Sequence, residues 1–89
     1  MVKKILKFYA DWCGPCKVMA KHFADVDLSN IEFVNVNIDD DANEELVNLY
    51  KIRNIPVSIF LDENNEILER VVGIITPSQI QAIIDKYGK

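Results

Sequence analysis

Both cysteines of this chain lie in the run Cys13-Gly14-Pro15-Cys16, where an apolar, strand-like stretch gives way to a helical pattern. A disulfide across this spacing closes a very short loop and stabilises a fold by roughly 2 kcal/mol, less than half of what a long loop provides. It would be a weak structural crosslink. Two thiols one turn apart at a helix N-terminus can, however, form and break a disulfide with little movement, and the helix end favours ionisation of the first thiol. The spacing therefore indicates thiol–disulfide redox chemistry.

The alternatives are a metal site and a pair of inert thiols. Two cysteines and a single histidine cannot complete the four-ligand set of a structural zinc ion, and His22 lies away from Cys16 on the helix. The acidic run 39–41 lacks the glycine and the ligand spacing of an EF-hand loop, so we interpret it as a helix cap. We expect no metal, and we expect His22 to be a solvated helix residue.

The position of each cysteine on the helix predicts its role. Cys13 stands at the helix start, where it is expected to be the more exposed thiol and to receive the helix dipole most directly. Lowering its pKa from about 8.5 to about 7 raises the thiolate fraction at pH 7 from a few per cent to half. We expect Cys13 to attack a substrate disulfide and the more buried Cys16 to resolve the resulting mixed disulfide.

Composition narrows the class of protein further. The chain has 89 residues, 49% of them hydrophobic, which suits a single domain over 1–89. Its net charge is −4, with basic residues spread along the sequence, so we expect neither a nucleic-acid nor a membrane partner. The basic start breaks off at Lys7 before a signal-peptide core develops, and no apolar run approaches the length of a membrane span. A cytoplasmic location is expected.

Hydrophobic periodicity predicts the order βαβαββα. Strand 4–10 is apolar on both faces and is expected to be central, with Lys7 sharing a face with Ile5 and Tyr9. An amphipathic helix is predicted over 13–26, with Pro15 in its first turn and Ala20 on its buried side. The remaining elements are a buried strand over 31–38, a helix over 43–51, a hairpin of strands 57–61 and 66–72, and a helix from Thr76 to about 87.

Four stretches of this sequence resemble the thioredoxin family. They are FYADWCGPCK at 8–17, Asn-Ile-Asp at 37–39, YKIRNIP at 50–56 and Val-Gly at 72–73. The resemblance covers essentially the whole chain. It implies a thioredoxin domain of the α/β class with a minimal fold, in which a four-stranded mixed sheet of order 2-1-3-4 is flanked by helices. Family members usually carry a further strand and helix before the strand that leads to the cysteines, so the resemblance is to a short form without them.

The resemblance also implies a low reduction potential and a groove that binds the substrate. Gly14 and Pro15 between the cysteines accompany a reducing potential in this family, near −270 mV for thioredoxin itself. Pro56 matches the family's cis-proline, which exposes the backbone of the preceding residue to an incoming peptide. The groove residues that the resemblance implies are Trp12, Ile38, Ile55, Pro56, Gly73 and Ile74. For Trp12 the alternative is a half-buried core aromatic.

Lys7 departs from the family pattern. It occupies the position where thioredoxins usually have a buried Asp beneath the second cysteine, and Asn35 replaces the usual Lys neighbour of that Asp. One interpretation is that Lys7 is partly desolvated, with a lowered pKa, and acts on Cys16 as a base or as a cation that stabilises the thiolate. The other is that Lys7 extends its ammonium to solvent and buries only its stem.

The function expected from the resemblance is that of a protein-disulfide reductase, an electron carrier that needs no cofactor beyond the Cys13–Cys16 disulfide. A thioredoxin reductase-like flavoprotein would recharge a monomeric chain, and disulfide-containing proteins such as ribonucleotide reductase or peroxiredoxins would be its targets. The alternatives are a glutaredoxin-like enzyme, a donor dedicated to ribonucleotide reductase, and a non-catalytic binding subunit. The Cys-Pro-Tyr-Cys and Gly-Gly signatures of glutaredoxins are missing.

Overall fold

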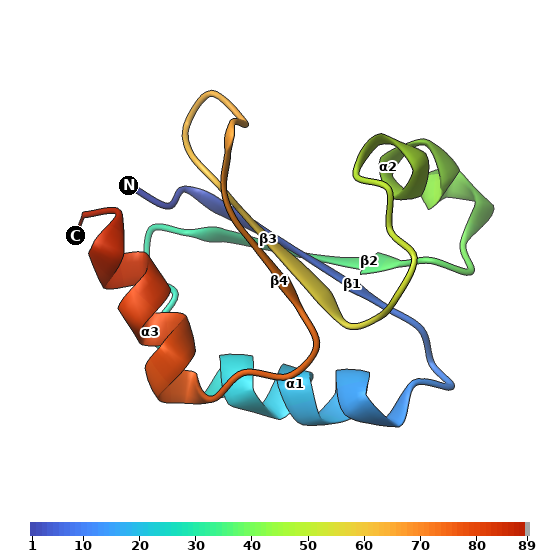
Figure 1. The fold of residues 1–89 in the computed structure, drawn as a ribbon, viewed down its shortest axis with the longest axis horizontal. Coiled ribbons are helices and arrows are strands. Elements are labelled where there is room, and N and C mark those ends of the chain that lie inside the picture. The colour runs from blue at the N-terminus through green and yellow to red at the C-terminus, as the bar shows by residue number, and fades with distance from the viewer. Residues whose placement is uncertain (89) are drawn as a thin grey trace.

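The computed structural model describes residues 1–88, and their elements follow the predicted order with one short 3₁₀ helix added (Figure 1). The elements are β1 (Lys4–Tyr9), α1 (Gly14–Ala24), β2 (Glu32–Asn37), η1 (Asp41–Asn43), α2 (Glu44–Leu49), β3 (Val57–Leu61), β4 (Ile67–Val72) and α3 (Pro77–Lys86). A parallel pair of strands needs a long crossover connection, and α1 supplies it between β1 and β2.

The strands form one four-stranded sheet of order β2-β1-β3-β4, as the resemblance implied. β1 runs parallel to β2 and antiparallel to β3, and β3 pairs with β4 in an antiparallel hairpin. The central position predicted for β1 is therefore confirmed. Its register places Lys7 opposite Asn35 of β2 and opposite Ser58 of β3. These side chains form a polar row that crosses the sheet.

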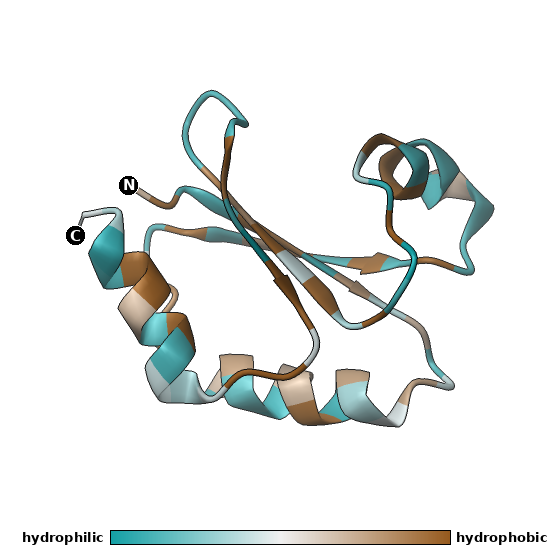
Figure 2. Cartoon of the chain, viewed as in Figure 1, coloured by the Kyte–Doolittle hydropathy of each residue, from teal (hydrophilic) through white to brown (hydrophobic). Residues whose placement is uncertain are grey.

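Two hydrophobic cores lie on opposite faces of the sheet. α1 and α3 cover one face and α2 covers the other (Figure 1). The strands are largely apolar, whereas the hairpin loop is polar (Figure 2). The core under α1 and α3 contains Ile5 and Phe60 of the sheet with Met19 of α1 and Ile80 of α3, all 0% exposed. Burial of each such side chain stabilises the fold by roughly 1.5–3 kcal/mol.

Three predicted environments were wrong. β2 is an edge strand in which only Val36 is buried, because it has a sheet partner on one side alone and its polar residues face outward. Ala20 is exposed, since the α1 face that meets the sheet is narrow. His22 is half-buried instead of solvated, and its Nδ1 donates a hydrogen bond of 2.8 Å to the Ile75 carbonyl. That bond ties α1 to the segment before α3.

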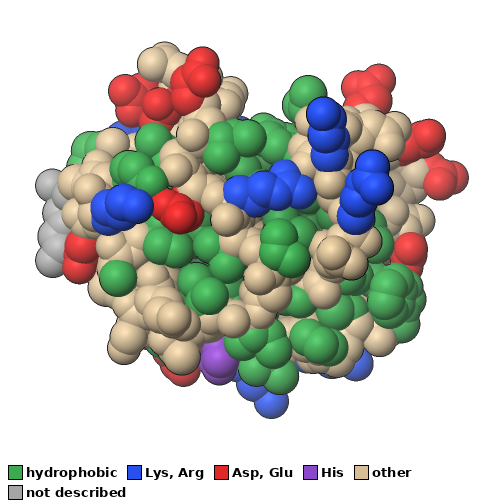
Figure 3. Space-filling view, in the orientation of Figure 1, with side chains coloured by type: hydrophobic (Ala, Val, Ile, Leu, Met, Phe, Trp, Pro, Cys, Tyr) green, Lys and Arg blue, Asp and Glu red, His purple; other side chains and the backbone are tan. Residues whose placement is uncertain are grey.

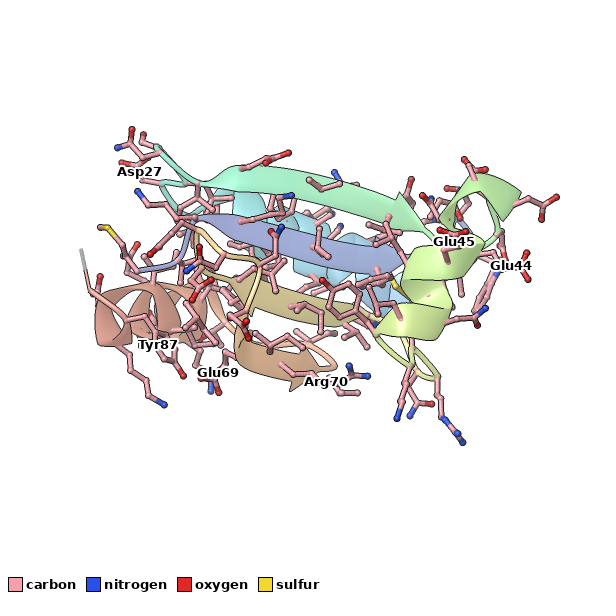
Figure 4. The ribbon with its side chains drawn as sticks, turned by 90° about the horizontal axis from the view of Figure 1, so that it is seen from above. Asp27, Glu44, Glu45, Glu69, Arg70 and Tyr87 are labelled. Atoms are coloured by element: carbon pink, nitrogen blue, oxygen red, sulfur yellow. A yellow bond between two sulfur atoms is a disulfide. The ribbon has the colours of Figure 1, made fainter. Side chains whose placement is uncertain are left out.

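Side-chain contacts connect the middle of β4 to α2 and to the end of α3 (Figure 4). Arg70 donates to the carbonyl oxygens of Tyr50, at 2.6 Å, and Lys51, at 3.2 Å, and so anchors the C-terminal end of α2 to the sheet. Beside Arg70, Glu69 is held from the end of α3, where the Tyr87 hydroxyl donates to Glu69 Oε1 at 2.7 Å. The hydrogen bond to Glu69 is the main reason that the pKa of Tyr87 is raised.

Helix α3 begins as its sequence predicted. Thr76 is the N-cap, Pro77 follows in the first turn, and Thr76 and Gln79 form a reciprocal capping box. Such a box satisfies backbone N–H groups that have no partner inside the helix. The helix start, and with it the end of the preceding loop at 73–75, is therefore fixed locally.

Candidate active site around Cys13 and Cys16

Cys13 and Cys16 form a disulfide at the N-terminus of α1, with their Cα atoms 5.3 Å apart. Cys13 is the N-cap residue of the helix, and its Sγ accepts a hydrogen bond of 3.1 Å from the backbone N–H of Cys16. After reduction, the same N–H group and the positive end of the helix would stabilise a thiolate on Cys13. A Cβ added at Gly14 would meet no atom within 4 Å, so local space does not require glycine there.

Both cysteines are largely enclosed. Cys13 is 5% exposed and Cys16 is 2% exposed. Cys13 is therefore the more exposed cysteine, as predicted, by a small difference. They pack with Ala10, and Ile38 and Ile55 lie against this cluster from two separate loops. The two sulfur atoms are thus held in an apolar setting, where charge–dipole interactions are stronger than in water.

The peptide bond between Ile55 and Pro56 is cis, as the resemblance implied, and Pro56 is buried. The carbonyl of Pro56 accepts a hydrogen bond of 2.8 Å from the N–H of Gly73. Gly73 has a φ of +91°, in the left-handed region that favours glycine. This bond brings the segment after β4 beside the segment before β3, and so joins two of the predicted groove segments.

Trp12 lies at the surface. It is 70% exposed, which rules out the core alternative, and its Nε1 donates a hydrogen bond of 2.8 Å to Asp39 Oδ2. The sequence predicts a helix cap from the run 39–41, and Asp40 makes it by accepting a hydrogen bond from Ala42 N. The sequence offered no signal for the Trp12–Asp39 pair, because the two residues come together only through the parallel pairing of β1 with β2.

Lys7 is buried on the α1 face of β1, with 4% of its surface exposed. Most of its side chain is therefore enclosed, as both interpretations require. Its Nζ lies 5.5 Å from the centre of the Tyr9 ring. Desolvation by burial lowers the pKa of Lys7 below its ordinary value. Lys7 and Cys16 both line one cavity beside α1.

The described residues offer neither a metal site nor a membrane span. Within 1–88, no three His, Cys, Asp or Glu side chains are grouped so that they could hold a metal ion. In the same part of the chain, no helix is long and apolar enough to cross a membrane.

A dithiol–disulfide pair at a helix N-terminus, beside a cis-proline on a mixed sheet, defines the class of thioredoxin-fold oxidoreductases. The family model "Thioredoxin" matches residues 2–86. This chain belongs to the thioredoxin family. Members of the family are thiol–disulfide oxidoreductases, and the chain has the cysteine pair that this chemistry requires.

Similar proteins are found among both sequences and structures. Thioredoxin C-3 of Corynebacterium nephridii is 34% identical over 92% of this chain, which spans 56% of that protein. A thioredoxin of Mycoplasmoides gallisepticum is 30% identical over 92% of this chain and 81% of its own length. Among solved structures, the reduced thioredoxin of Schistosoma mansoni has a TM-score of 0.75 and 32% identity, covering 94% of this chain and 77% of the other. The chain thus spans between about half and four fifths of these relatives.

Proposed function

We propose that this chain reduces protein disulfides. The observation that carries the proposal is the position of Cys13, which caps α1 and accepts the Cys16 N–H on its sulfur. This arrangement makes Cys13 the nucleophile that attacks one sulfur of a substrate disulfide and releases the other as a thiolate. Cys16 then attacks Cys13, the Cys13–Cys16 bond forms, and the second substrate sulfur leaves. The substrate gains two electrons and the cysteine pair loses two.

The partners follow from this cycle. The oxidised pair must be reduced again, and a flavoprotein of the thioredoxin reductase kind is the partner that family membership supports. The substrates are proteins with accessible disulfides. A monomer in the cytoplasm, where the thiol pool is reducing, suits the proposed direction of electron flow. The Gly14–Pro15 pair supports the same direction.

Three measurements test the reductase function. The chain should accelerate the reduction of insulin by dithiothreitol, and Cys13→Ser should remove the acceleration. Equilibration against glutathione should give a reduction potential of about −270 mV, the value typical of thioredoxin. A reduction potential of about −120 mV, typical of a strong oxidant, would contradict the proposal. So would turnover of small disulfides that depends on glutathione alone, which is the behaviour of a glutaredoxin.

The proposed docking groove is the surface around the disulfide formed by Trp12, Ile38, Ile55, Pro56, Gly73 and Ile74. Trp12 and Ile74 are its exposed apolar members, at 70% and 46%. The half-buried Ile55 stands directly before cis-Pro56, so its backbone is the edge on which an extended substrate peptide could pair. Hydrophobic side chains also lie over β4 (Figure 3). An apolar rim of this kind suits proteins whose disulfide sits in an extended, partly apolar segment.

Trp12→Ala should weaken docking without affecting the cysteine chemistry. Exposed tryptophans at interfaces commonly contribute more than 1 kcal/mol, so we expect KM for insulin to rise about tenfold. The reaction with a small disulfide such as 5,5′-dithiobis(2-nitrobenzoate) should keep its rate. Leu49→Ala is the matched control, because Leu49 is 68% exposed on α2, outside the groove. An unchanged KM in Trp12→Ala would exclude Trp12 from the docking surface.

A further inference from the structure

β2 lies at one edge of the sheet, and its outer side carries unused backbone groups (Figure 4). The N–H groups of Glu32 and Ile38 both donate toward β1, at 2.9 Å, so the even-numbered residues of this strand turn their backbone groups to that side. Successive residues alternate, and Phe33 and Asn35 therefore turn their N–H and C=O groups outward. Within residues 1–88, β2 pairs with β1 alone, so these outward groups have no strand to bond.

The opposite edge strand, β4, is protected against further pairing, whereas β2 is not. Glu69 and Arg70 place adjacent charges in the middle of β4, and the register of β4 with β3 is irregular. Charged side chains and bulges commonly keep an edge from accepting another strand. In β2 the charge is confined to Glu32 at the start, and residues 33–37 contain neither a charged residue nor a proline. The outer side of β2 is therefore open to a further strand.

Two adjoining cavities lie between this edge and α1. Their volumes are about 540 Å³ and about 230 Å³, and Lys7, Ala20 and Asn35 line both of them. We call the pair the β2 hollow. Phe33 and Leu28 make its smaller end apolar. Residues that face each other on paired strands share one side of the sheet, so an added strand would point the side chains opposite Phe33 and Asn35 into this hollow.

The β2 hollow contains a cation without a counterion. Lys7 is 4% exposed, and none of the ion pairs found within residues 1–88 involves it. A buried charge is costly unless it is paired, and burial lowers the pKa of Lys7 accordingly. Lys17 is a second cation of the lining, and Asp11, the acidic residue there, is exposed and forms no ion pair with either lysine. The hollow thus lacks a carboxylate at Lys7.

Ser58 is a second polar group beside Lys7 that the chain leaves unused. It stands directly opposite Lys7 on β3 and is 0% exposed. Its Oγ has no hydrogen-bond partner within residues 1–88, and a buried hydroxyl in that state is costly. The polar row across the sheet therefore has spare capacity for a charged or hydrogen-bonding group beside it.

From these observations we propose that β2 and the β2 hollow bind an extended segment of a partner protein, one that carries an acidic side chain with apolar side chains two residues away on both sides. The backbone of the segment pairs with Phe33 and Asn35. Its carboxylate lies opposite Asn35 and reaches the ammonium of Lys7. The apolar side chains fill the two ends of the hollow, since alternate residues of a strand share a face.

This site lies apart from the proposed docking groove, because none of the groove residues lines either cavity. A partner held there leaves Cys13 free to engage a substrate. A second copy of β2 is a poorer occupant of the edge. Its carboxylate, Glu32, lies on the α2 face of the sheet beside Leu46 and Leu49, and paired residues keep to one face, so that carboxylate cannot reach Lys7.

An NMR titration with a defined peptide tests the site. The probe is a heptapeptide in which threonine alternates with valine, glutamate and valine in that order, so that the glutamate and both valines share a face. In the ¹⁵N-labelled chain, we expect the amide signals of Phe33 and Asn35 to shift on binding and those of Trp12 and Gly73 to stay unchanged. Replacing the glutamate with glutamine should weaken binding about tenfold, the effect of losing one hydrogen bond between charged groups.

Variants of the chain separate the charge from the backbone pairing. Lys7→Met should bind the glutamate and glutamine peptides equally, because the preference for glutamate requires the ammonium. Lys21→Met is the matched control: it removes an exposed lysine of α1 outside the hollow and should keep the preference of about tenfold. Asn35→Pro removes an outward N–H group, which an edge strand tolerates, and should weaken the binding of both peptides.

Several results would overturn the proposal. They are the absence of any shift at about 1 mM peptide, shifts confined to β4 or to the docking groove, and equal affinity of the unsubstituted chain for the two peptides. Shifts of Phe33 and Asn35 that follow protein concentration without peptide would assign the edge to a second copy instead. The comparison of peptides needs no variant, so it decides the matter even if a variant misfolds. The peptide contains no cysteine, so its binding is independent of the proposed reductase function.

Discussion

Cys16→Ser is expected to hold the chain to its substrates as a stable mixed disulfide. Cys13 would retain its position at the N-cap of α1, and the backbone N–H of residue 16 would still stabilise its thiolate. The first attack would therefore proceed, but a serine hydroxyl cannot displace the substrate sulfur. The rate of complete turnover should fall by at least about a thousandfold, since the step that releases product is lost.

Non-reducing electrophoresis measures this outcome directly. Cys16→Ser incubated with an oxidised protein substrate should give a new band at the sum of the two masses, which dithiothreitol removes. Cys13→Ser is the matched control and should give no such band, because Cys16 is the more enclosed sulfur. The opposite pattern, with adducts in Cys13→Ser alone, would exchange the two roles.

Phe60→Ala is expected to lower the free energy of unfolding by about 3–5 kcal/mol, the usual cost of removing a buried phenylalanine ring. Phe60 lies on β3, is 0% exposed and belongs to the core under α1 and α3. Its ring lies 6.5 Å from that of Phe23 on α1, so the vacated space adjoins the helix that carries the cysteines. Because whole domains are stable by about 5–15 kcal/mol, the loss would leave a marginal fold.

Urea denaturation of the oxidised protein checks this prediction. Ile67→Ala is the control in the same hairpin, because Ile67 is 52% exposed and its truncation should change stability by no more than about 0.5 kcal/mol. Equal losses in the two variants would mean that the core under α1 does not carry the stability assigned to it.

Hydrophobic periodicity predicted the order of helices and strands correctly. It could do so because helices cover both faces of the sheet, and the buried residues therefore leave a regular apolar pattern in the sequence. β1 alternates between two cores, so every residue from Ile5 to Phe8 is buried and the strand was correctly expected to be central. β2 misled the prediction, since its valines resemble a buried strand although the sheet ends there. Burial of an edge strand depends on what lies beside it in space, and sequence pattern alone does not contain that information.

The site was predictable where residues adjacent in sequence make it. Cys13 and Cys16 lie within one turn, so their spacing already implied the pairing that the structure contains. The Trp12–Asp39 bond and the opposition of Lys7 and Ser58 both result from strand register, which is set by the whole sheet. Sequence reasoning singled out Lys7 because it departs from the family pattern. It missed Ser58, because only the register of β1 and β3 places Ser58 opposite Lys7.

The hydrogen bond between His22 and the Ile75 carbonyl connects α1 to the chain just after Ile74, a residue of the proposed docking groove. The N-terminus of the same helix carries Cys13 and Cys16. In the proposed docking groove, one helix therefore sets the spacing between the disulfide and the segment at Ile74.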